Sequence, residues 1–383
     1  MNIRLSLFCF FILNTITSFL CFSQQEKVVK QKMMLVEKDL VSKQNLYERM
    51  KYYGVPGVSI AVINNSKLEW TKGYGVAKAG SNKAVTTETM FQAASISKPI
   101  TATVALYFVQ NGKLNLDTDV NEQLKSWKVP ENEYTKEQKV TLRRILSHTA
   151  GLTVSGFRGY RENEPKPTLI EILEGKKPAN SDPVRVFAVP GSQYKYSGGG
   201  YIVLQLLLEE LTGENFSDLA EKVVFDPLEM VNSVFFKPPI PEEFESKLSS
   251  GHLDDGTIIQ GNWFAKFGSC CGLWSTPSDL AKWLIDIQLS LSGESNKVLS
   301  VETVREMLTK QKIDGGQTVD AGLGVELFGD GSTFEHGGNN PGFRCYMFIS
   351  KESGNGAVIM TNSSNGGDLV KEIYDNIIHV YGW

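Results

Sequence analysis

The residues most suited to chemistry are Ser95 and Lys98, three positions apart in the segment 95–98 (SISK). If a helix begins here, their side chains lie as neighbours on one face, whereas Ser97 lies off it and is the weaker nucleophile candidate. A serine hydroxyl becomes a strong nucleophile once a base takes its proton, and a desolvated lysine can be that base. A helix N-terminus adds N–H groups and partial positive charge where an oxyanion would form. The spacing therefore predicts a nucleophilic serine, although by itself it more often marks a helix-capping serine followed by a surface lysine.

A second candidate is Tyr196, which lies just before three consecutive glycines at positions 198–200. Consecutive glycines let a backbone approach another group closely. A tyrosine near a lysine can also move protons during catalysis. The alternative interpretation is a packing tyrosine on a turn.

The third candidate segment is 336–343 (HGGNNPGF), which is expected to lie between strands. Glycines beside a strand edge expose N–H groups that can hold an oxyanion or a substrate carboxylate. This selects His336, Gly337, Gly338 and Asn339 as candidate binding residues. The alternative is a glycine-rich hairpin loop.

A rival nucleophile is Cys270, in the centre of the segment 268–272 (GSCCG). A nucleophile elbow of this kind needs a strand before it and a helix after it. Residues 262–267 form a poor strand pattern, which disfavours the rival.

Strand-like patterns occupy both ends of the chain, and helical patterns occupy its middle. This predicts an α/β (α+β) fold in which one antiparallel sheet is built from both chain ends, is flanked by terminal helices and carries an inserted, mainly helical lobe. The sheet lobe is expected at about 24–90 and 310–383, and the helical lobe at about 91–309. The expected elements are a helix at 29–53, a hairpin at 57–76, a buried helix at 99–110, a long irregular excursion at 153–195, strands at 321–328, 343–350 and 357–361, and a closing helix at 369–381.

Composition and the N-terminal residues limit which partners, cellular locations and cofactors are expected. Lysine and arginine number 39 against 43 acidic residues, a net charge of −4, and the lack of a long basic run excludes nucleic acid as an expected partner. Residues 1–23 resemble a signal peptide in their short positive start and apolar core, so export is expected, with an uncleaved N-terminal membrane anchor as the alternative. The four histidines show no metal-binding spacing, so neither a metal nor a cofactor is expected.

The order of the three motifs resembles the penicillin-recognising serine hydrolases. The branch it is most similar to contains class C β-lactamases, D-Ala-D-Ala carboxypeptidases and related esterases. Three further segments match, namely 146–152 (LSHTAGL), Pro190-Gly191 and 272–281 (GLWSTPSDLA), and the resemblance extends over about 45–381. It implies a β-lactamase/transpeptidase-like fold, location in the periplasm or outside the cell, and a small-molecule or peptide substrate.

The resemblance also implies roles for the candidate residues. Ser95 matches the nucleophile that forms an acyl-enzyme, Lys98 its base partner, and Tyr196 the tyrosine that moves the proton to the leaving group. Either Lys98 or Tyr196 is the general base, and a base role for Lys98 requires its pKa to be lowered by burial and by Tyr196. The backbone N–H groups of Ser95 and Asn339 match the oxyanion hole.

Two positions depart from the family pattern. Gly198 stands where an asparagine usually binds the acylamide group of the substrate. The segment His336-Gly337-Gly338 replaces Lys-Thr-Gly, which weakens carboxylate recognition because histidine is less reliably charged at neutral pH. We therefore expect a serine hydrolase acting on β-lactams, D-amino-acid peptides or small esters, with weak β-lactam turnover. The alternative is a penicillin-binding or sensor protein that does not release its ligand.

Overall fold

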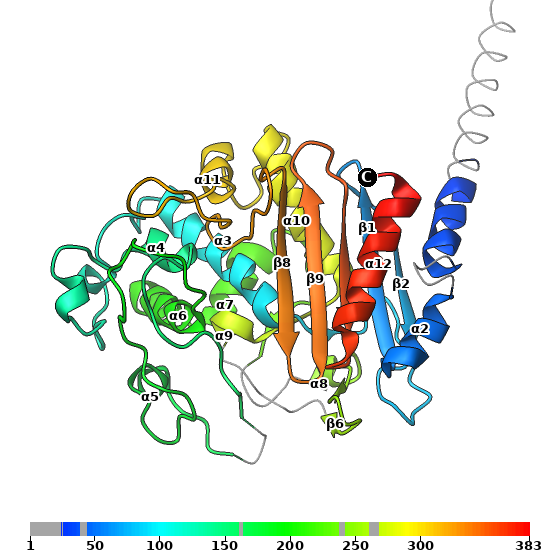
Figure 1. Ribbon diagram of the computed structural model, residues 1–383, viewed down its shortest axis with the longest axis horizontal. Coiled ribbons are helices and arrows are strands. Elements are labelled where there is room, and N and C mark those ends of the chain that lie inside the picture. Colours follow the sequence, from blue (N-terminus) through cyan, green and yellow to red (C-terminus); the bar gives the residue numbers. More distant parts are fainter. Residues whose placement is uncertain (1–23, 25, 39–43, 161–163, 237–241, 260–267) are drawn as a thin grey trace, which may run out of the picture.

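The two ends of the chain meet in one antiparallel sheet, as predicted. The computed structural model describes residues 24, 26–38, 44–160, 164–236, 242–259 and 268–383, so the predicted signal peptide at 1–23 lies outside the described residues. The five strands are ordered β2-β1-β10-β9-β8 (Figure 1). Their bounds are β1 Gly57–Asn64, β2 Lys67–Gly75, β8 Thr333–Asn340, β9 Phe343–Ser350 and β10 Gly356–Thr361.

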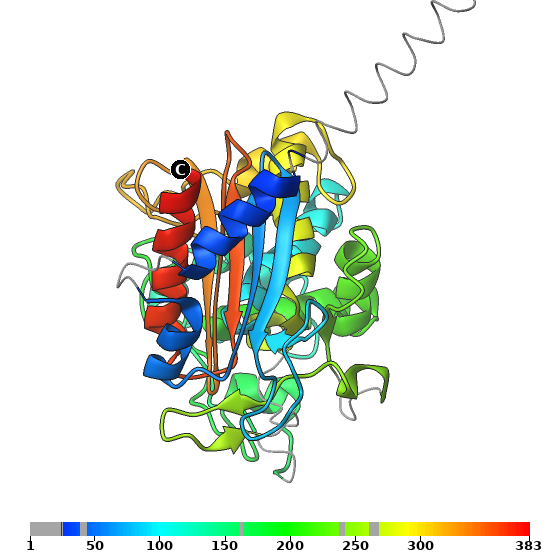
Figure 2. The same ribbon diagram turned by 90° about the vertical axis from the view of Figure 1, so that its right-hand side faces the viewer.

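Helices from both chain ends cover one face of this sheet. Figure 2 shows α2 (Leu46–Tyr53) and α12 (Gly366–Tyr381) in front of the strands, with the helical lobe behind. An ion pair of 2.6 Å between Arg49 and Glu372 joins the two helices. The predicted single helix at 29–53 is wrong: residues 26–38 are helical, and a new helix begins after Asn45, whose side chain accepts a hydrogen bond from the Glu48 N–H. Because both faces are covered, every residue of β10 is buried.

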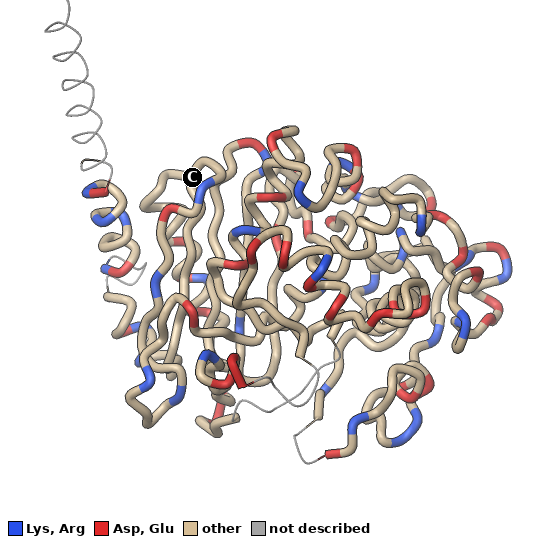
Figure 3. Tube along the Cα trace, turned by 180° about the vertical axis from the view of Figure 1, so that it is seen from behind, with Lys and Arg blue, Asp and Glu red and all other residues tan. Residues whose placement is uncertain are grey.

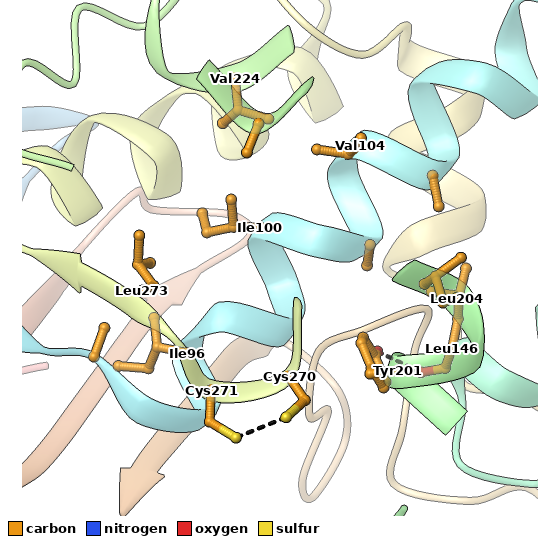
Figure 4. Packing of buried hydrophobic residues seen from close by; sticks show 14 of the residues in the cluster. Ile96, Ile100, Val104, Leu146, Tyr201, Leu204, Val224, Cys270, Cys271 and Leu273 are labelled. Carbon is orange, nitrogen blue, oxygen red and sulfur yellow. Dashed lines mark hydrogen bonds between the residues drawn. The ribbon is translucent and has the colours of Figure 1, made fainter. Parts of the chain in front are cut away.

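The helical lobe is built around α3 (Ser97–Gln110), in which residues 97–106 are all buried. Figure 4 shows Ile100 and Val104 of α3 packed among side chains from the surrounding helices. The lobe's other helices are α4 Leu142–Leu146, α5 Leu169–Glu174, α6 Gly198–Thr212, α7 Phe216–Ala220 with a π-helical turn at Glu221–Phe225, α8 Glu242–Glu245, α9 Gly268–Cys271, α10 Pro277–Ser292 and α11 Val301–Met307. Its short strands are β3 Phe91–Gln92, β4 Val234–Phe235, β5 Gly251–His252, β6 Ile258–Ile259 and β7 Leu273–Ser275.

The strand predicted at 321–328 is wrong. Its residues form only two isolated bridges, Ala321 with Glu326 and Glu326 with Glu335. The cause is close packing on α3: Gly324 has φ +89°, and a Cβ there would lie 2.2 Å from the Cβ of Ala102. The segment 336–343 was expected between strands, but its first five residues lie inside the edge strand β8, and only 341–342 form the turn to β9.

Charged side chains of both signs are interspersed along the described chain (Figure 3). In that part of the molecule, no helix combines the length and the apolar character needed to span a bilayer.

Candidate active site

The start of α3 brings Ser95 and Lys98 together. Ser95 lies in a 3-10 turn (Ala94–Ile96) that leads directly into the helix, and the preceding residue, Ala94, has a left-handed φ of +51°. The Lys98 Nζ donates hydrogen bonds to the Ser95 Oγ at 3.2 Å and to the backbone oxygen of Cys270 at 2.9 Å. Lys98 is only 1% exposed, whereas Ser95 is half-buried. The ammonium group is therefore held beneath the serine hydroxyl by two fixed contacts.

Ser97 has a structural role and not a catalytic one. Its Oγ donates to the Ala94 backbone oxygen at 2.6 Å and accepts from the Leu273 N–H at 3.0 Å. These bonds fasten the turn that carries Ser95 to the strand β7. Ser97 is fully buried, so it is not presented to a substrate.

The start of α6 brings Tyr196 to the same place. The Lys98 Nζ lies 4.7 Å from the centre of the Tyr196 ring. Ser197 caps α6, because its Oγ accepts a hydrogen bond from the Gly200 N–H at 3.0 Å. Gly199 allows close approach of the neighbouring loop, since a Cβ there would lie 2.7 Å from the Thr153 oxygen.

His148 is a supporting residue that the sequence analysis did not select. Its ring lies 4.3 Å from the Tyr196 ring, centre to centre, and its Nδ1 accepts a hydrogen bond from the Ser197 N–H at 3.1 Å. Burial, together with the charge of Lys98, holds the pKa of His148 well below the ordinary histidine value. The neutral ring therefore packs behind Tyr196 and fixes its orientation. The sequence could have indicated His148, because it lies in the segment 146–152 that matches the family.

The edge strand β8 forms another wall of the candidate site, beside the turn that carries Ser95. Gly338 packs directly on the turn that carries Ser95, because a Cβ there would lie only 2.4 Å from the Ala93 oxygen. His336 is buried, and its Nδ1 lies 2.7 Å from the Gly337 oxygen, so that nitrogen carries the proton. Burial and the charge of Lys98 lower the pKa of His336 to about 3. The wall therefore presents a neutral histidine at neutral pH.

The expected lowering of the Lys98 pKa is wrong. Burial by itself lowers the pKa, but the electrostatic attraction of Tyr196, Cys271 and Cys270 outweighs it, so the pKa of Lys98 lies above the ordinary lysine value. Lys98 is consequently a fixed cation at neutral pH.

Two cavities meet at Ser95. One, the Gly198 cavity, has a volume of about 680 Å³, and its walls include Phe157, Gly198 and Arg344. The other, the Glu326 cavity, has a volume of about 610 Å³, and its walls include Glu326 and the β8 residues His336, Gly337 and Gly338. The residues shared by both walls are Ser95, Tyr196 and Asn339. The candidate nucleophile Ser95 and the candidate proton carrier Tyr196 therefore lie at the junction of the two cavities. A substrate bound there could extend one part into each cavity.

Glu326 is a second residue that the sequence analysis did not select. Burial and the neighbouring charge of Glu335 raise its pKa to about 7. It belongs to the segment that was expected to form a strand, and only the actual path of that segment brings it to the cavity.

The vicinal cysteines support the site through their backbone. Figure 4 shows the two sulfur atoms facing each other, 2.7 Å apart. The Cys270 oxygen accepts from Lys98, and the Cys271 oxygen accepts from the Asn340 Nδ2 at 3.2 Å. In the described part of this segment a short helix precedes the strand β7, which is the reverse of the order that a nucleophile elbow requires.

No group of three or more potential metal-ligating side chains occurs among the residues with described positions.

Comparisons with known proteins show the family of the chain. The family described as Beta-lactamase matches residues 43–381. Penicillin-binding protein 4 from Amycolatopsis lactamdurans is 30% identical over 202 residues, which cover 52% of this chain and 49% of that protein. A β-lactamase from Pseudomonas fluorescens is 28% identical over 235 residues, which cover 61% of this chain and 60% of that protein. The matches therefore span about half to three fifths of the length of these curated relatives.

A solved structure gives the fold. The D-amino acid amidase from Ochrobactrum anthropi SV3 superposes with a TM-score of 0.70 at 21% identity, covering 92% of this chain and 99% of that one. At this identity the likeness establishes the β-lactamase/transpeptidase-like fold.

Proposed function

The chain belongs to the beta-lactamase family of serine hydrolases, and we propose that it forms an acyl-enzyme on Ser95 with small amide or ester substrates. One observation carries the proposal: the Ser95 Oγ lies 3.2 Å from the buried Nζ of Lys98, at the meeting point of two cavities that also share Tyr196. A serine hydroxyl next to a buried cation and a phenol has the neighbours that nucleophilic attack on a carbonyl requires.

The raised pKa of Lys98 supports a proposal for the proton transfers. A lysine that keeps its proton cannot take another from Ser95, so we assign the general base to the oxygen of Tyr196, which takes that proton as the phenolate. Lys98 stabilises the negative charge that Tyr196 carries before it takes the proton, and it holds the Ser95 oxygen in place. The same phenol returns the proton to the leaving group, which frees the amine or alcohol and leaves the acyl group on Ser95.

The backbone N–H groups of Ser95 and Asn339 are assigned to the oxyanion. Both residues line both cavities, and Gly338 brings the edge of β8 against the turn that carries Ser95. N–H groups fixed by backbone packing stabilise a developing charge without reorganising.

The substrate is proposed to be a D-amino-acid derivative or a small ester in preference to a β-lactam. A neutral His336 beside Gly337 offers no positive charge to a substrate carboxylate, and Gly198 has no side-chain amide for an acylamide group. A hydrogen bond missing from a buried site costs about 1–3 kcal/mol. The relatives include both a β-lactamase and a D-amino acid amidase, so both classes of acyl donor occur among similar proteins. Export is proposed from the sequence of residues 1–23.

Intact mass after mixing tests the proposal. The protein without residues 1–23 is incubated with benzylpenicillin or with p-nitrophenyl butyrate, beside a Ser95→Ala control. We expect p-nitrophenol release that the control lacks, and a mass increase on the wild type only when deacylation is slow. A stable penicillin adduct without turnover would support the alternative of a binding or sensor protein. Equal p-nitrophenol release by Ser95→Ala would overturn the assignment of the nucleophile.

A further inference from the structure

Two adjacent cysteines, Cys270 and Cys271, lie at the catalytic site, and the proposed mechanism does not use their sulfur atoms. Neither belongs to a disulfide in the described part of the chain, and their sulfurs face each other at 2.7 Å (Figure 4). Both side chains are buried, but Cys271 lines the Gly198 cavity, which Ser95 also lines. A small reagent that enters this cavity can therefore reach one thiol of the pair.

The surroundings of the pair favour oxidation. The ammonium group of Lys98 interacts electrostatically with both cysteines. A cation beside a thiol favours the thiolate, which is the form that peroxides attack. Cys345, the third cysteine of residues 24–383, differs from the pair. Burial raises its pKa to about 12, so it stays a thiol at neutral pH, and its Sγ donates to the Gln92 oxygen at 3.2 Å.

The backbone of the pair holds side chains of the site in place. The Cys270 oxygen accepts a hydrogen bond from the Lys98 Nζ at 2.9 Å, and the Cys271 oxygen accepts one from the Asn340 Nδ2 at 3.2 Å. Consecutive Cα atoms are about 3.8 Å apart, whereas the Cα atoms of disulfide-bonded cysteines are usually roughly 4.4–6.8 Å apart. A bond between the two sulfurs therefore strains the peptide unit that joins the cysteines. Because this unit carries the Cys270 oxygen, oxidation moves the acceptor that positions Lys98.

We propose that Cys270 and Cys271 form a reversible oxidation site that switches off the hydrolase. A peroxide transfers one oxygen atom to the Cys271 thiol, which becomes a sulfenic acid, and the peroxide is reduced to water or an alcohol. The Cys270 sulfur then attacks the sulfenic sulfur, water leaves, and a disulfide joins the two residues. A dithiol reduces this bond and restores both thiols, and a strained disulfide is easily reduced. The loss of activity rests on the proposed acyl-enzyme at Ser95, whereas the formation of the bond does not.

Treatment of the purified protein with hydrogen peroxide tests the proposal. The protein is first reduced with dithiothreitol, then oxidised, and a portion is reduced again. One measured quantity is kcat/KM for p-nitrophenyl butyrate. The other is the mass of the tryptic peptide 267–282, which contains both cysteines of the pair and no other cysteine.

We expect peroxide to lower kcat/KM by about 10- to 100-fold, since a shift of about 1 Å in a catalytic group can cost up to about 100-fold. The peptide should lose two hydrogen atoms, and the second reduction should reverse both changes. Peroxide also oxidises methionine, but dithiothreitol does not reverse that reaction. Cys271→Ala, compared with its own reduced sample, is expected to keep its activity. Cys345→Ala is the matched control and should respond like the wild type.

Each other outcome overturns a defined statement. A peptide that keeps its hydrogen atoms after peroxide treatment overturns the oxidation site, and so does an equal loss of activity in Cys271→Ala. Formation of the bond with unchanged kcat/KM overturns the switch and leaves Ser95 as the nucleophile. A Ser95→Ala variant as active as the wild type overturns the proposed function, and the peptide mass then decides the oxidation site by itself.

Discussion

Replacing Tyr196 with phenylalanine separates the two candidate bases by removing a single oxygen atom. The Tyr196 ring packs 4.3 Å from the His148 ring, and the Lys98 Nζ lies 4.7 Å from its centre. Phenylalanine keeps both ring contacts, so the substitution deletes the hydroxyl and little else. The fold and the position of Lys98 are expected to persist.

The expected loss follows from the role that the structure leaves to this oxygen. General acid–base catalysis by one positioned side chain contributes about 10²- to 10⁴-fold. At about 1.36 kcal/mol for each factor of ten, Tyr196→Phe should raise the activation barrier by about 2.7–5.4 kcal/mol. The pKa of Lys98 should fall in the same variant, because Tyr196 contributes most to raising it.

The assay is the release of p-nitrophenol from p-nitrophenyl butyrate, measured as kcat/KM between pH 6 and pH 10. Tyr194→Phe is the matched control: it is the same chemical change two residues away, at a ring 6.0 Å from His148. We expect the control to keep kcat/KM within about threefold. Thermal melting of both variants separates a catalytic loss from a folding defect.

The reasoning fails if Tyr196→Phe keeps more than about one tenth of the wild-type kcat/KM. Lys98 would then have to accept the proton. In that case the wild-type rate should keep rising with pH up to pH 10, because the pKa of Lys98 lies above the ordinary lysine value.

Three further predictions use other parts of the site. Burial of His336 holds its pKa at about 3 in the folded protein, so the unfolded chain binds more protons below pH 6.5. The stability that this residue contributes is complete above that pH and falls by about 2 kcal/mol from pH 7 to pH 5, so denaturant titration of His336→Gln should show an acid-induced loss smaller than that of the wild type by this amount, with His148 still contributing. Gly338→Ala should cost about 1–3 kcal/mol of stability, since its Cβ would meet the Ala93 oxygen, whereas Gly337→Ala, with open space around its Cβ, should melt like the wild type. Cys270→Ala should keep most of the esterase activity, because Lys98 is contacted by the backbone oxygen of Cys270 and not by its sulfur. Near-complete loss of activity would instead support Cys270 as the nucleophile.

The sheet was predictable from local sequence patterns. The hairpin at 57–76 is fixed by apolar strands on either side of a short polar turn, and the structure gives β1 and β2 with the turn at Asn65 and Ser66, both at positive φ. The strand at 321–328 was not predictable in the same way. Its apolar residues suggested pairing, but close contacts of its glycines with residues distant in sequence hold it against α3. Periodicity does not contain that information.

The site was predictable in its residues and not in its electrostatics. The spacing of Ser95 and Lys98 is a local property, and it placed the two side chains within 3.2 Å of each other. The sign of the Lys98 pKa shift depends instead on Tyr196 and on the cysteine pair, which approach Lys98 only after folding. Glu326 was missed for the same reason, because its place in the cavity follows from a segment whose path the sequence did not indicate.

Position 198 is closely packed, which changes how the substrate preference should be interpreted. The Gly198 N–H donates to the Ser155 oxygen at 3.2 Å, and a Cβ at position 198 would lie 3.1 Å from that oxygen. The adjoining Phe157 lines the same cavity, so loop backbone and an aromatic ring occupy the side where an asparagine would reach the substrate. Gly198→Asn alone is therefore not expected to restore full acylamide recognition, because its Cβ would press on the Ser155 oxygen and the loop would have to shift by a few tenths of an ångström. A substrate with a bulky acylamide group meets this wall, whereas a compact acyl group does not.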